Sequence, residues 1–380
     1  MKPFTISVPD AVLADLRDRL GRVRWPDEAP GAPWAYGTDL ETVKGLVAYW
    51  RDGFDWRAQE AALNAWPQFS TELAGIDVHF VHAKGVGPNP MPLLISHGWP
   101  GSIVEFQQIL PRLTDPAKFG GDPRDAFTVV APSLPGYGFS FRPNQPRFGL
   151  PAIADVFATL MTDVLGYQKF AAQGGDWGAF ITTLLAAKHP GRLTGIHLTL
   201  LAAGREATGP TTHVDEDVQR YLEQAKVWER EGTGYQWIQG TRPQTLAYGL
   251  TDSPVGLLAW ILDKFQAWTD CQGDVLRHIA RDTILTNVTI YWVTGAINSS
   301  FWPYYWRRHE PWPLTRGQRI DVPTAYAAFP KEILLPPRAW AEKTYDIRRW
   351  TVMKSGGHFA AIEEPEALAD DIAAFFRPLR

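Results

Sequence analysis

The chain has 380 residues, of which 45% are hydrophobic and 21% charged, a composition typical of a globular protein. Its net charge of −4 at pH 7 gives no indication of a nucleic-acid partner or of an anionic membrane as a partner. The single cysteine, Cys271, excludes an intrachain disulfide and is compatible with a reducing compartment.

The sequence shows no targeting or membrane-spanning segment. The first residues after Met1 contain no apolar run of the kind found in secretory signals. No stretch approaches the roughly 20 apolar residues that a bilayer-spanning helix needs. We therefore predict a cytoplasmic protein without a membrane anchor.

Residues 1–74 are predicted to form a helical and irregular N-terminal segment. Leu13, Leu16 and Leu20 fall on one helical face, and Thr38 with Glu41 predicts a capping box at the start of a second helix. No catalytic group stands out in this segment. We expect it to wrap around or pack against the rest of the chain.

From residue 75 onward, short apolar runs alternate with helical runs, as in a sheet that is buried on both faces. The runs predicted as strands are 76–81, 92–96, 127–131, 169–173, 194–200, 322–327 and 350–354. Residues 205–315 interrupt this alternation with helical, aromatic-rich sequence. The sequence thus predicts an α/β fold with a mostly parallel central sheet and helices on both faces. Residues 75–204 and 316–380 form its core, and residues 205–315 form a helical cap.

The motif GGDWG at 174–178 lies between a predicted strand and a predicted helix. Small residues in such a strand–turn–helix let the backbone bend sharply and expose one side chain as a nucleophile. Here the exposed side chain is the carboxylate of Asp176. A carboxylate can displace a leaving group from carbon and form an alkyl ester, so we predict Asp176 as the nucleophile.

A histidine and an acid are needed to release such an ester. His358 follows the last predicted strand in a glycine-rich loop, and with an ordinary pKa of about 6.5 it can take a proton from water. Glu332 follows the strand 322–327 at the carboxyl edge of the sheet, where ligand sites of parallel sheets lie. Glu206 lies too far beyond its strand, and Asp346 precedes the last strand at the wrong end. Glu332 is therefore the predicted partner of His358.

Two backbone N–H groups are predicted to stabilise the oxyanion that forms when water attacks the ester. The N–H of Trp177 opens the helix after the nucleophile, where the helix dipole adds to its effect. The second donor is assigned to the N–H of Trp99 in the turn HGWPG at 97–101, in which Pro100 is a candidate for a cis peptide bond.

The electrophile is either an epoxide or an alkyl halide. An epoxide opens to a basic alkoxide and needs a proton donor, and a tyrosine with a pKa of about 10 suits that task. Tyr235 and either Tyr304 or Tyr305 in the cap are the candidates. Trp177 does not discriminate, because its indole N–H would suit a halide. Haloalkane dehalogenase is thus the alternative function.

These motifs together resemble the epoxide hydrolases of the microsomal and juvenile-hormone type, within the α/β-hydrolase superfamily. The resemblance covers nearly the whole chain, and the cap motifs are not shared with dehalogenases. The segments that carry it are residues 4–26, HGWPGS at 97–102, PSLPGYGFS at 132–140, GGDWG at 174–178, residues 234–257, TNVTIYW at 286–292 and GGHFAAIEEPE at 356–366.

The resemblance implies Asp176 as nucleophile, His358 as base, Glu332 as its acid, and Tyr235 and Tyr304 as donors to the epoxide oxygen. Tyr305 adjoins Tyr304, which leaves the choice between these two open. The implied reaction converts an apolar epoxide with water to a vicinal diol, without cofactor or metal. No nucleic acid or membrane is implied as a partner, and a homo-oligomer is compatible with the sequence. A non-catalytic binding protein and a metal-dependent hydrolase are disfavoured, the latter because no HExxH motif occurs.

Overall fold

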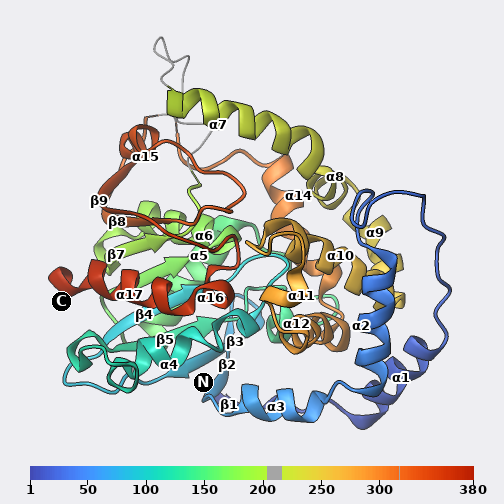
Figure 1. Ribbon diagram of the computed structural model, residues 1–380. Helices are drawn as coiled ribbons and strands as arrows, with labels where there is room; N and C mark the ends of the chain where they lie inside the picture. Colours follow the sequence, from blue (N-terminus) through green and yellow to red (C-terminus); the bar gives the residue numbers. More distant parts are fainter. Residues whose placement is uncertain (203–215, 316) are drawn as a thin grey trace.

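One sheet runs through the centre of the computed structural model, which describes residues 1–202, 216–315 and 317–380 (Figure 1). In these residues nine strands lie in the order β1-β2-β3-β5-β4-β6-β7-β8-β9. Their bounds are β1 Lys2–Phe4, β2 Gln68–Leu73, β3 Ile76–Ala83, β4 Met91–Ser96, β5 Phe127–Pro132, β6 Phe170–Gly174, β7 Leu193–Leu198, β8 Ile320–Ala328 and β9 Tyr345–Val352. The pairs from β5 to β9 are parallel, whereas β1, β2 and β3 pair antiparallel. The predicted mostly parallel sheet is confirmed.

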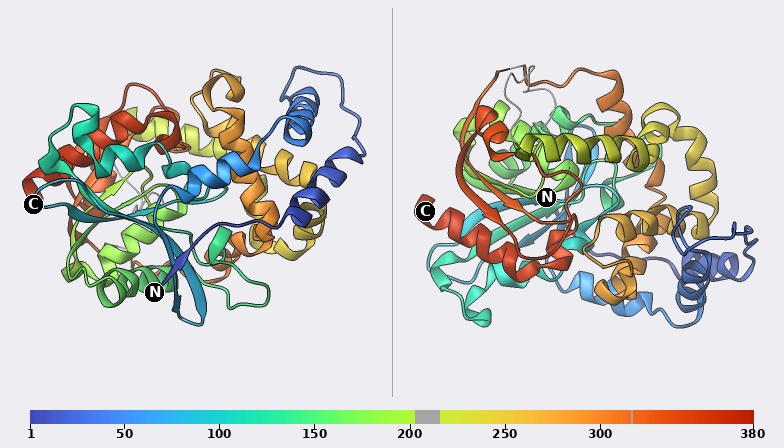
Figure 2. Two further views of the ribbon diagram at one scale, coloured as in Figure 1. Left: turned by 90° about the horizontal axis from the view of Figure 1, so that it is seen from below. Right: turned by 45° about the horizontal axis from the view of Figure 1, so that its top comes forward.

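Helices cover both faces of this sheet, as predicted. Figures 1 and 2 show α4 (Ile109–Thr114) and α17 (Pro365–Phe376) on one face, and α5 (Leu150–Thr159) and α6 (Asp176–Lys188) on the other. The strands between them are buried because each face is covered by a helix layer. The helix α17 buries Leu368, Ile372 and Phe375, the three residues that the sequence places on one apolar face.

A buried carboxylate ties α17 to the sheet. Asp371 accepts hydrogen bonds from His197 Nε2 of β7 at 2.9 Å, from Arg349 Nε of β9 at 2.7 Å and from Thr351 Oγ1 of β9 at 2.6 Å. Burial alone would raise the pKa of Asp371, but these hydrogen bonds outweigh it and hold the pKa below its ordinary value. The carboxylate therefore stabilises the fold in its ionised form.

The last strand is longer than the sequence predicts. β9 begins at Tyr345 rather than at Trp350, so Asp346 lies within the strand. Arg348 and Arg349 interrupt the apolar pattern there, because β9 is the terminal strand of the sheet and is only partly buried. Asp346 remains at the amino end of the strand, away from the carboxyl edge.

The N-terminal segment contributes strands as well as helices, and the prediction of a purely helical and irregular segment is wrong at both its ends. β1 and β2 pair with each other, and β2 pairs with β3, so the segment extends the sheet. Its helices are α1 (Asp10–Gly21), α2 (Leu40–Asp52) and α3 (Trp56–Asn64). β1 has three residues, too few for an alternating pattern to be recognised.

The start of α2 is capped one residue later than predicted. Asp39 Oδ2 accepts hydrogen bonds from the backbone N of Thr42 at 2.9 Å and from its hydroxyl at 2.7 Å. The hydroxyl of Thr38 instead donates to the carbonyl of Ala259 in the cap at 2.8 Å. The predicted capping box of Thr38 and Glu41 is therefore wrong. The Thr38 side chain is engaged in a tertiary hydrogen bond, and Asp39, a residue type favoured at helix N-termini, caps α2 instead.

The helices of the cap follow β7 and precede β8. They are α7 Glu216–Val227, α8 Gly234–Thr241, α9 Pro243–Asp252, α10 Pro254–Trp268, α11 Val275–His278, α12 Arg281–Thr294, α13 Ile297–Ser300 and α14 Trp302–His309. Figure 1 shows α7 passing over the sheet, and α8 to α14 beside it next to α1 and α2. The predicted boundary at 204/205 and the candidate acid Glu206 lie outside the described residues, as does residue 316, where the second part of the core was predicted to begin.

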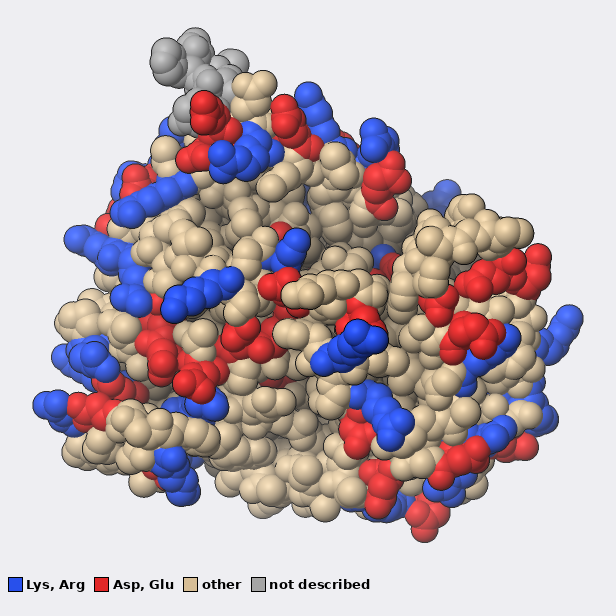
Figure 3. Space-filling model, in the orientation of Figure 1, with Lys and Arg blue, Asp and Glu red and all other residues tan. Residues whose placement is uncertain are grey.

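Charges of both signs are intermixed on the surface. On the face shown in Figure 3, Lys and Arg side chains alternate with Asp and Glu side chains over the core and the cap. Among the described helices, none combines the length and the apolar character that crossing a bilayer requires.

Candidate active site

The nucleophile elbow is formed where β6 passes into α6. Asp176 adopts a φ of +47°, a left-handed conformation that is uncommon for a residue other than glycine and that turns its side chain out of the bend. Gly178 permits this turn, because a Cβ at that position would lie 2.0 Å from the carbonyl oxygen of Ser96 in β4. The predicted strand–turn–helix is confirmed, and glycine is required where the helix meets the neighbouring strand.

The turn after β4 holds the carboxylate of Asp176. The backbone N–H of Trp99 donates to Asp176 Oδ1 at 2.7 Å, and the Trp99–Pro100 peptide bond is cis, as the sequence suggests. Gly98 packs directly against the carboxylate, since a Cβ there would lie 2.1 Å from Oδ1. One of the two predicted oxyanion donors thus contacts Asp176, and the role of the Trp177 N–H stays a prediction.

His358 lies between two carboxylates. Its Nε2 is 3.3 Å from Asp176 Oδ2, and its Nδ1 is 2.6 Å from Glu332 Oε1. Burial lowers the pKa of His358, but the charges of Glu332 and Asp176 outweigh that effect and raise the pKa well above its ordinary value. The site therefore favours the doubly protonated, cationic form of the imidazole. The structure brings the three predicted residues together in the geometry of a nucleophile, a base and an orienting acid.

The cap also positions His358. Trp268, the last residue of α10, accepts a hydrogen bond from the backbone N of His358 at 2.9 Å, and its indole ring meets the imidazole edge-on at 5.0 Å. The buried carboxylate of Glu363 accepts a hydrogen bond from Phe359 N at 2.9 Å and another from Asp270 N at 2.8 Å. The histidine loop is thus attached to the end of a cap helix.

Two tyrosines of the cap approach the nucleophile from helices α8 and α14. Tyr235 and Tyr304 are both buried, and their ring centroids are 5.5 Å apart. Burial raises the pKa of both phenols, and the negative charge of Asp176 raises it further. Both therefore remain protonated at neutral pH, as a proton donor must.

Tyr305 is turned away from this pair. Its ring stacks on Trp302 at 4.8 Å and on His309 at 4.1 Å. Tyr304, not Tyr305, lines the cavity with Asp176 and Tyr235. The structure therefore favours Tyr304 as the second donor.

A cavity of about 410 Å³ opens above Asp176 between the sheet edge, α7, α8 and α14. Its walls are mostly apolar with a few polar groups, an arrangement typical of small-molecule sites. Besides Asp176 and the two tyrosines, the polar residues that line it are Glu229, Thr233, Gln236, Arg307 and Arg308. The apolar and aromatic residues that line it include Trp177, Phe180, Leu200, Leu201, Trp228, Ile333 and Leu334.

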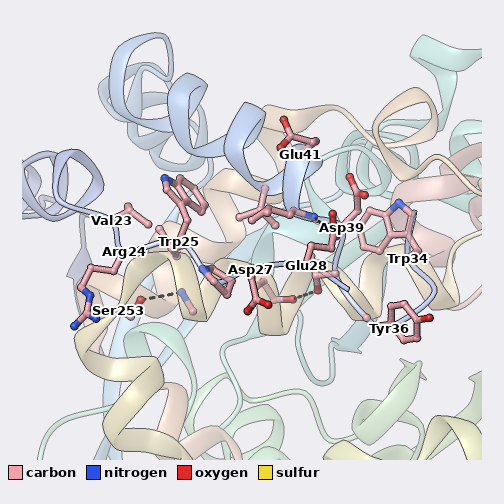
Figure 4. Close-up of a pocket in the computed structure, with 18 of the residues that line it drawn as sticks. Val23, Arg24, Trp25, Asp27, Glu28, Trp34, Tyr36, Asp39, Glu41 and Ser253 are labelled. Atoms are coloured by element: carbon pink, nitrogen blue, oxygen red, sulfur yellow. Dashed lines mark hydrogen bonds between the residues drawn. The ribbon is translucent and has the colours of Figure 1, made fainter. Parts of the chain in front are cut away.

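A larger groove, of about 1130 Å³, lies between residues 19–43 and the start of α10 (Figure 4). Figure 4 shows Trp25, Trp34 and Tyr36 around it, together with the acidic side chains of Asp27 and Glu28. Neither the nucleophile nor the two tyrosines line it. The smaller cavity, which contains them, is therefore the candidate active site.

Comparison with known proteins agrees with this geometry. Residues 1–106 match the family described as epoxide hydrolase N terminus, and residues 91–232 match the alpha/beta hydrolase fold. The chain is 38% identical to epoxide hydrolase 1 of Oryctolagus cuniculus, an alignment that covers 99% of this chain and 88% of the relative. The chain belongs to the epoxide hydrolase family.

Solved structures of the family have the same fold over the whole chain. The epoxide hydrolase of Aspergillus niger superposes with a TM-score of 0.85 at 31% identity, covering 100% of this chain and 96% of that one. The juvenile hormone epoxide hydrolase of the silkworm Bombyx mori superposes with a TM-score of 0.83 at 29% identity, covering 100% and 94%. The predicted resemblance, the α/β-hydrolase fold and the assignment to the hydrolases are confirmed.

Three contacts at the candidate site are not predicted from the sequence. These are the approach of Gly98 to the carboxylate, the carbonyl of Trp268 behind His358, and Lys264, whose ammonium lies over the ring of Tyr235 at 4.8 Å. Lys264 carries a signal that could have been used, since it is four residues from both Trp260 and Trp268 and shares their helical face. In the part of the chain that the structure describes, no group of three or more His, Cys, Asp or Glu side chains is arranged to hold a metal ion.

Proposed function

We propose that this epoxide hydrolase converts an apolar epoxide to a vicinal diol through a covalent ester on Asp176. The observation that carries the proposal is that Asp176, Tyr235 and Tyr304 line one and the same cavity, with His358 next to Asp176 and Glu332 next to His358. A carboxylate nucleophile and two neutral phenols are the two kinds of group that epoxide opening requires.

In the first step, Asp176 Oδ2 attacks one epoxide carbon and the bond from that carbon to the ring oxygen breaks. The ring oxygen takes a proton from Tyr235 or Tyr304 and becomes a hydroxyl group. Asp176 Oδ1, which accepts the hydrogen bond from Trp99 N–H, becomes the carbonyl oxygen of the ester. This hydrogen bond and the turn at Asp176 orient the carboxylate before the substrate binds. Such orientation of the nucleophile is the principal contribution of the elbow to the rate.

In the second step, His358 takes a proton from water and the resulting hydroxide attacks the ester carbonyl carbon. Alkylation removes the charge of Asp176, which is one of the two carboxylates that raise the pKa of His358. Ester formation therefore lowers the pKa of His358, and its extra proton neutralises the phenolate left by the first step. The imidazole is then a base when water must be deprotonated. The oxyanion forms on Oδ1, where the N–H of Trp99 and, by our proposal, that of Trp177 stabilise it. The ester C–O bond then breaks, and the departing diol oxygen takes the proton that His358 removed from water. The proton left on the Asp176 carboxyl group passes to His358, which restores the carboxylate and the protonated imidazole.

The apolar walls of the cavity favour an apolar epoxide. Aromatic and aliphatic side chains surround the reacting groups, so binding removes apolar substrate surface from water. We infer that the enzyme acts in the cytoplasm on such compounds, in detoxification or in the catabolism of aromatic hydrocarbons.

The test is a single turnover in heavy-oxygen water with enzyme in excess over an aromatic epoxide. The ester mechanism places the heavy oxygen in the Asp176 carboxyl group, which mass spectrometry of the peptide containing Asp176 detects, and leaves the first diol unlabelled. Label in the first diol would indicate direct attack of water and would overturn the proposal. The Asp176→Ala variant, which has no nucleophile, is the control. Halide release from short haloalkanes, without epoxide turnover, would favour the dehalogenase alternative.

A further inference from the structure

The ring of Tyr235 contacts a cation that is largely shielded from solvent. Lys264 of α10 places its Nζ 4.8 Å from the centroid of the Tyr235 ring, 5.8 Å from that of Trp268 and 5.9 Å from that of Trp260. Only 12% of the Lys264 side chain is exposed. An ammonium this well shielded from water interacts strongly with the electron-rich faces of aromatic rings.

Lys264 contacts the Tyr235 ring and does not itself line the cavity. It is absent from the residues that line the cavity in the described chain, whereas Tyr235 lines it. The indole of Trp99 stacks on the same tyrosine ring, with centroids 5.3 Å apart and planes 10° apart. Tyr235 is thus held between aromatic neighbours and the ammonium while its side chain reaches the cavity.

The other charges at the site are of both signs, since Arg307 and Arg308 line the cavity and His358 lies against Asp176. Asp176 and Glu332 both act on the Tyr235 hydroxyl as negative charges, and Tyr304 is neutral. Asp263 pairs with Lys264 at 2.5 Å, and its side chain is 32% exposed, so water screens that carboxylate more than it screens the ammonium. The positive end of this ion pair is the end that meets the ring.

The Lys264 ammonium lies where it can affect the transfer of the proton from Tyr235 to the epoxide oxygen. As the phenol gives up this proton, negative charge develops on its oxygen and spreads into its ring. A cation at 4.8 Å stabilises the charged ring more than the neutral one. Stabilisation that grows toward the transition state accelerates the step, whereas burial and the two carboxylates oppose ionisation of the phenol.

We propose that Lys264 is a positioning residue that strengthens Tyr235 as the hydrogen-bond donor to the epoxide oxygen. The proposal rests on the proposed function, because it requires Tyr235 to be a donor in ester formation. It predicts an effect on ester formation and none on ester hydrolysis, in which Tyr235 takes no part.

The experiment follows ester formation by rapid quenching and intact-mass measurement, and follows ester hydrolysis by the decay of the same adduct. Lys264→Met should slow ester formation about tenfold, the size of one buried cation–π interaction, and leave adduct decay unchanged. Lys264→Arg should restore most of the rate because it keeps the charge. In the Tyr235→Phe background, Lys264→Met should have no further effect, since the group through which it acts is gone.

The control is Lys84→Met, which removes another lysine that lies over a tyrosine ring, that of Tyr167 at 5.5 Å, outside the cavity. It should form and hydrolyse the ester at the parental rates. Lys264→Gln replaces Lys264→Met if the latter does not fold, and is interpreted in the same way.

The outcomes separate this proposal from the proposed function. The role of Lys264 is refuted if a folded Lys264→Met variant forms the ester at the parental rate. It is also refuted if Lys264→Met slows ester formation equally in the parent and in the Tyr235→Phe background. If Tyr235→Phe itself is as fast as the parent, the donor role of Tyr235 fails and the role of Lys264 fails with it. If the parent turns over epoxide without any adduct, the ester mechanism itself is wrong.

Discussion

Replacing Gly98 by alanine tests how closely the turn after β4 must approach the nucleophile. The Cβ of an alanine at this position would lie 2.1 Å from Asp176 Oδ1 and 2.5 Å from its Cγ, whereas ordinary van der Waals contact begins at 3.4 Å. Gly98 is not among the glycines with a positive φ, so the substitution acts through this contact and not through backbone strain.

The size of the effect follows from the overlap. To restore ordinary contact with Oδ1, the carboxylate must move by about 1.3 Å, and a misplacement of about 1 Å costs roughly a hundredfold in rate. Moving Oδ1 also breaks its 2.7 Å hydrogen bond from Trp99 N–H, and losing one oxyanion donor costs about 10²-fold to 10³-fold. We therefore expect ester formation to slow by at least about a hundredfold and ester hydrolysis to slow as well.

The assay is the rapid-quench measurement of adduct formation and decay, with thermal unfolding recorded on the same samples. Gly45→Ala in α2 is the matched control, because a Cβ at Gly45 meets no atom within 4 Å and the change favours the helix. Adduct formation at the parental rate in a folded Gly98→Ala variant would refute the reasoning, since it would mean that the carboxylate can react without the position seen here.

Three further predictions follow from the site and the core. His358→Gln should accumulate the ester, because glutamine cannot take the proton from water; an intact mass without adduct, despite turnover by the parent, would contradict the mechanism. Tyr304→Phe should slow ester formation by about 10²-fold, the lower range of general-acid effects. Tyr305→Phe should form the ester at the parental rate. Equal losses of rate in the two variants would contradict the assignment of Tyr304. Asp371→Asn should lower the free energy of unfolding by about 2–4 kcal/mol in urea titrations without changing kcat, because it breaks a buried network. Since the pKa of Asp371 is held below its unfolded value, this loss should be full above about pH 4 and should shrink as the pH falls further; a loss independent of pH would contradict the ionised role.

Local sequence pattern was sufficient to predict the core and to predict that Asp176, Glu332 and His358 meet. The apolar runs of β4, β5 and β6 predict buried parallel strands because burial on both faces leaves no alternation to obscure them. Asp176, Glu332 and His358 follow strands at the carboxyl edge of the sheet. A parallel sheet brings the ends of its strands to one edge, so residues 156 and 26 positions apart meet there as predicted.

Local sequence patterns gave wrong or incomplete predictions where a side chain contacts a residue far away in the sequence. Thr38 does not cap helix α2, because its hydroxyl donates to the carbonyl of Ala259 in helix α10. The local sequence around Thr38 does not reveal this contact. Tyr304 and Tyr305 are equivalent in composition, and only the direction of α14 decides which phenol enters the cavity and which stacks on His309.

The sequence by itself therefore determined the α/β architecture and which carboxylates and histidine meet at the sheet edge, because these depend on hydrophobic periodicity and on the positions of strand ends. Only the tertiary structure decided the contact of Gly98 with Asp176, the choice of Tyr304 and the ammonium of Lys264 over Tyr235. Each of these depends on how a cap helix or a turn packs against another part of the chain. That packing is set by three-dimensional side-chain complementarity, which no local pattern encodes.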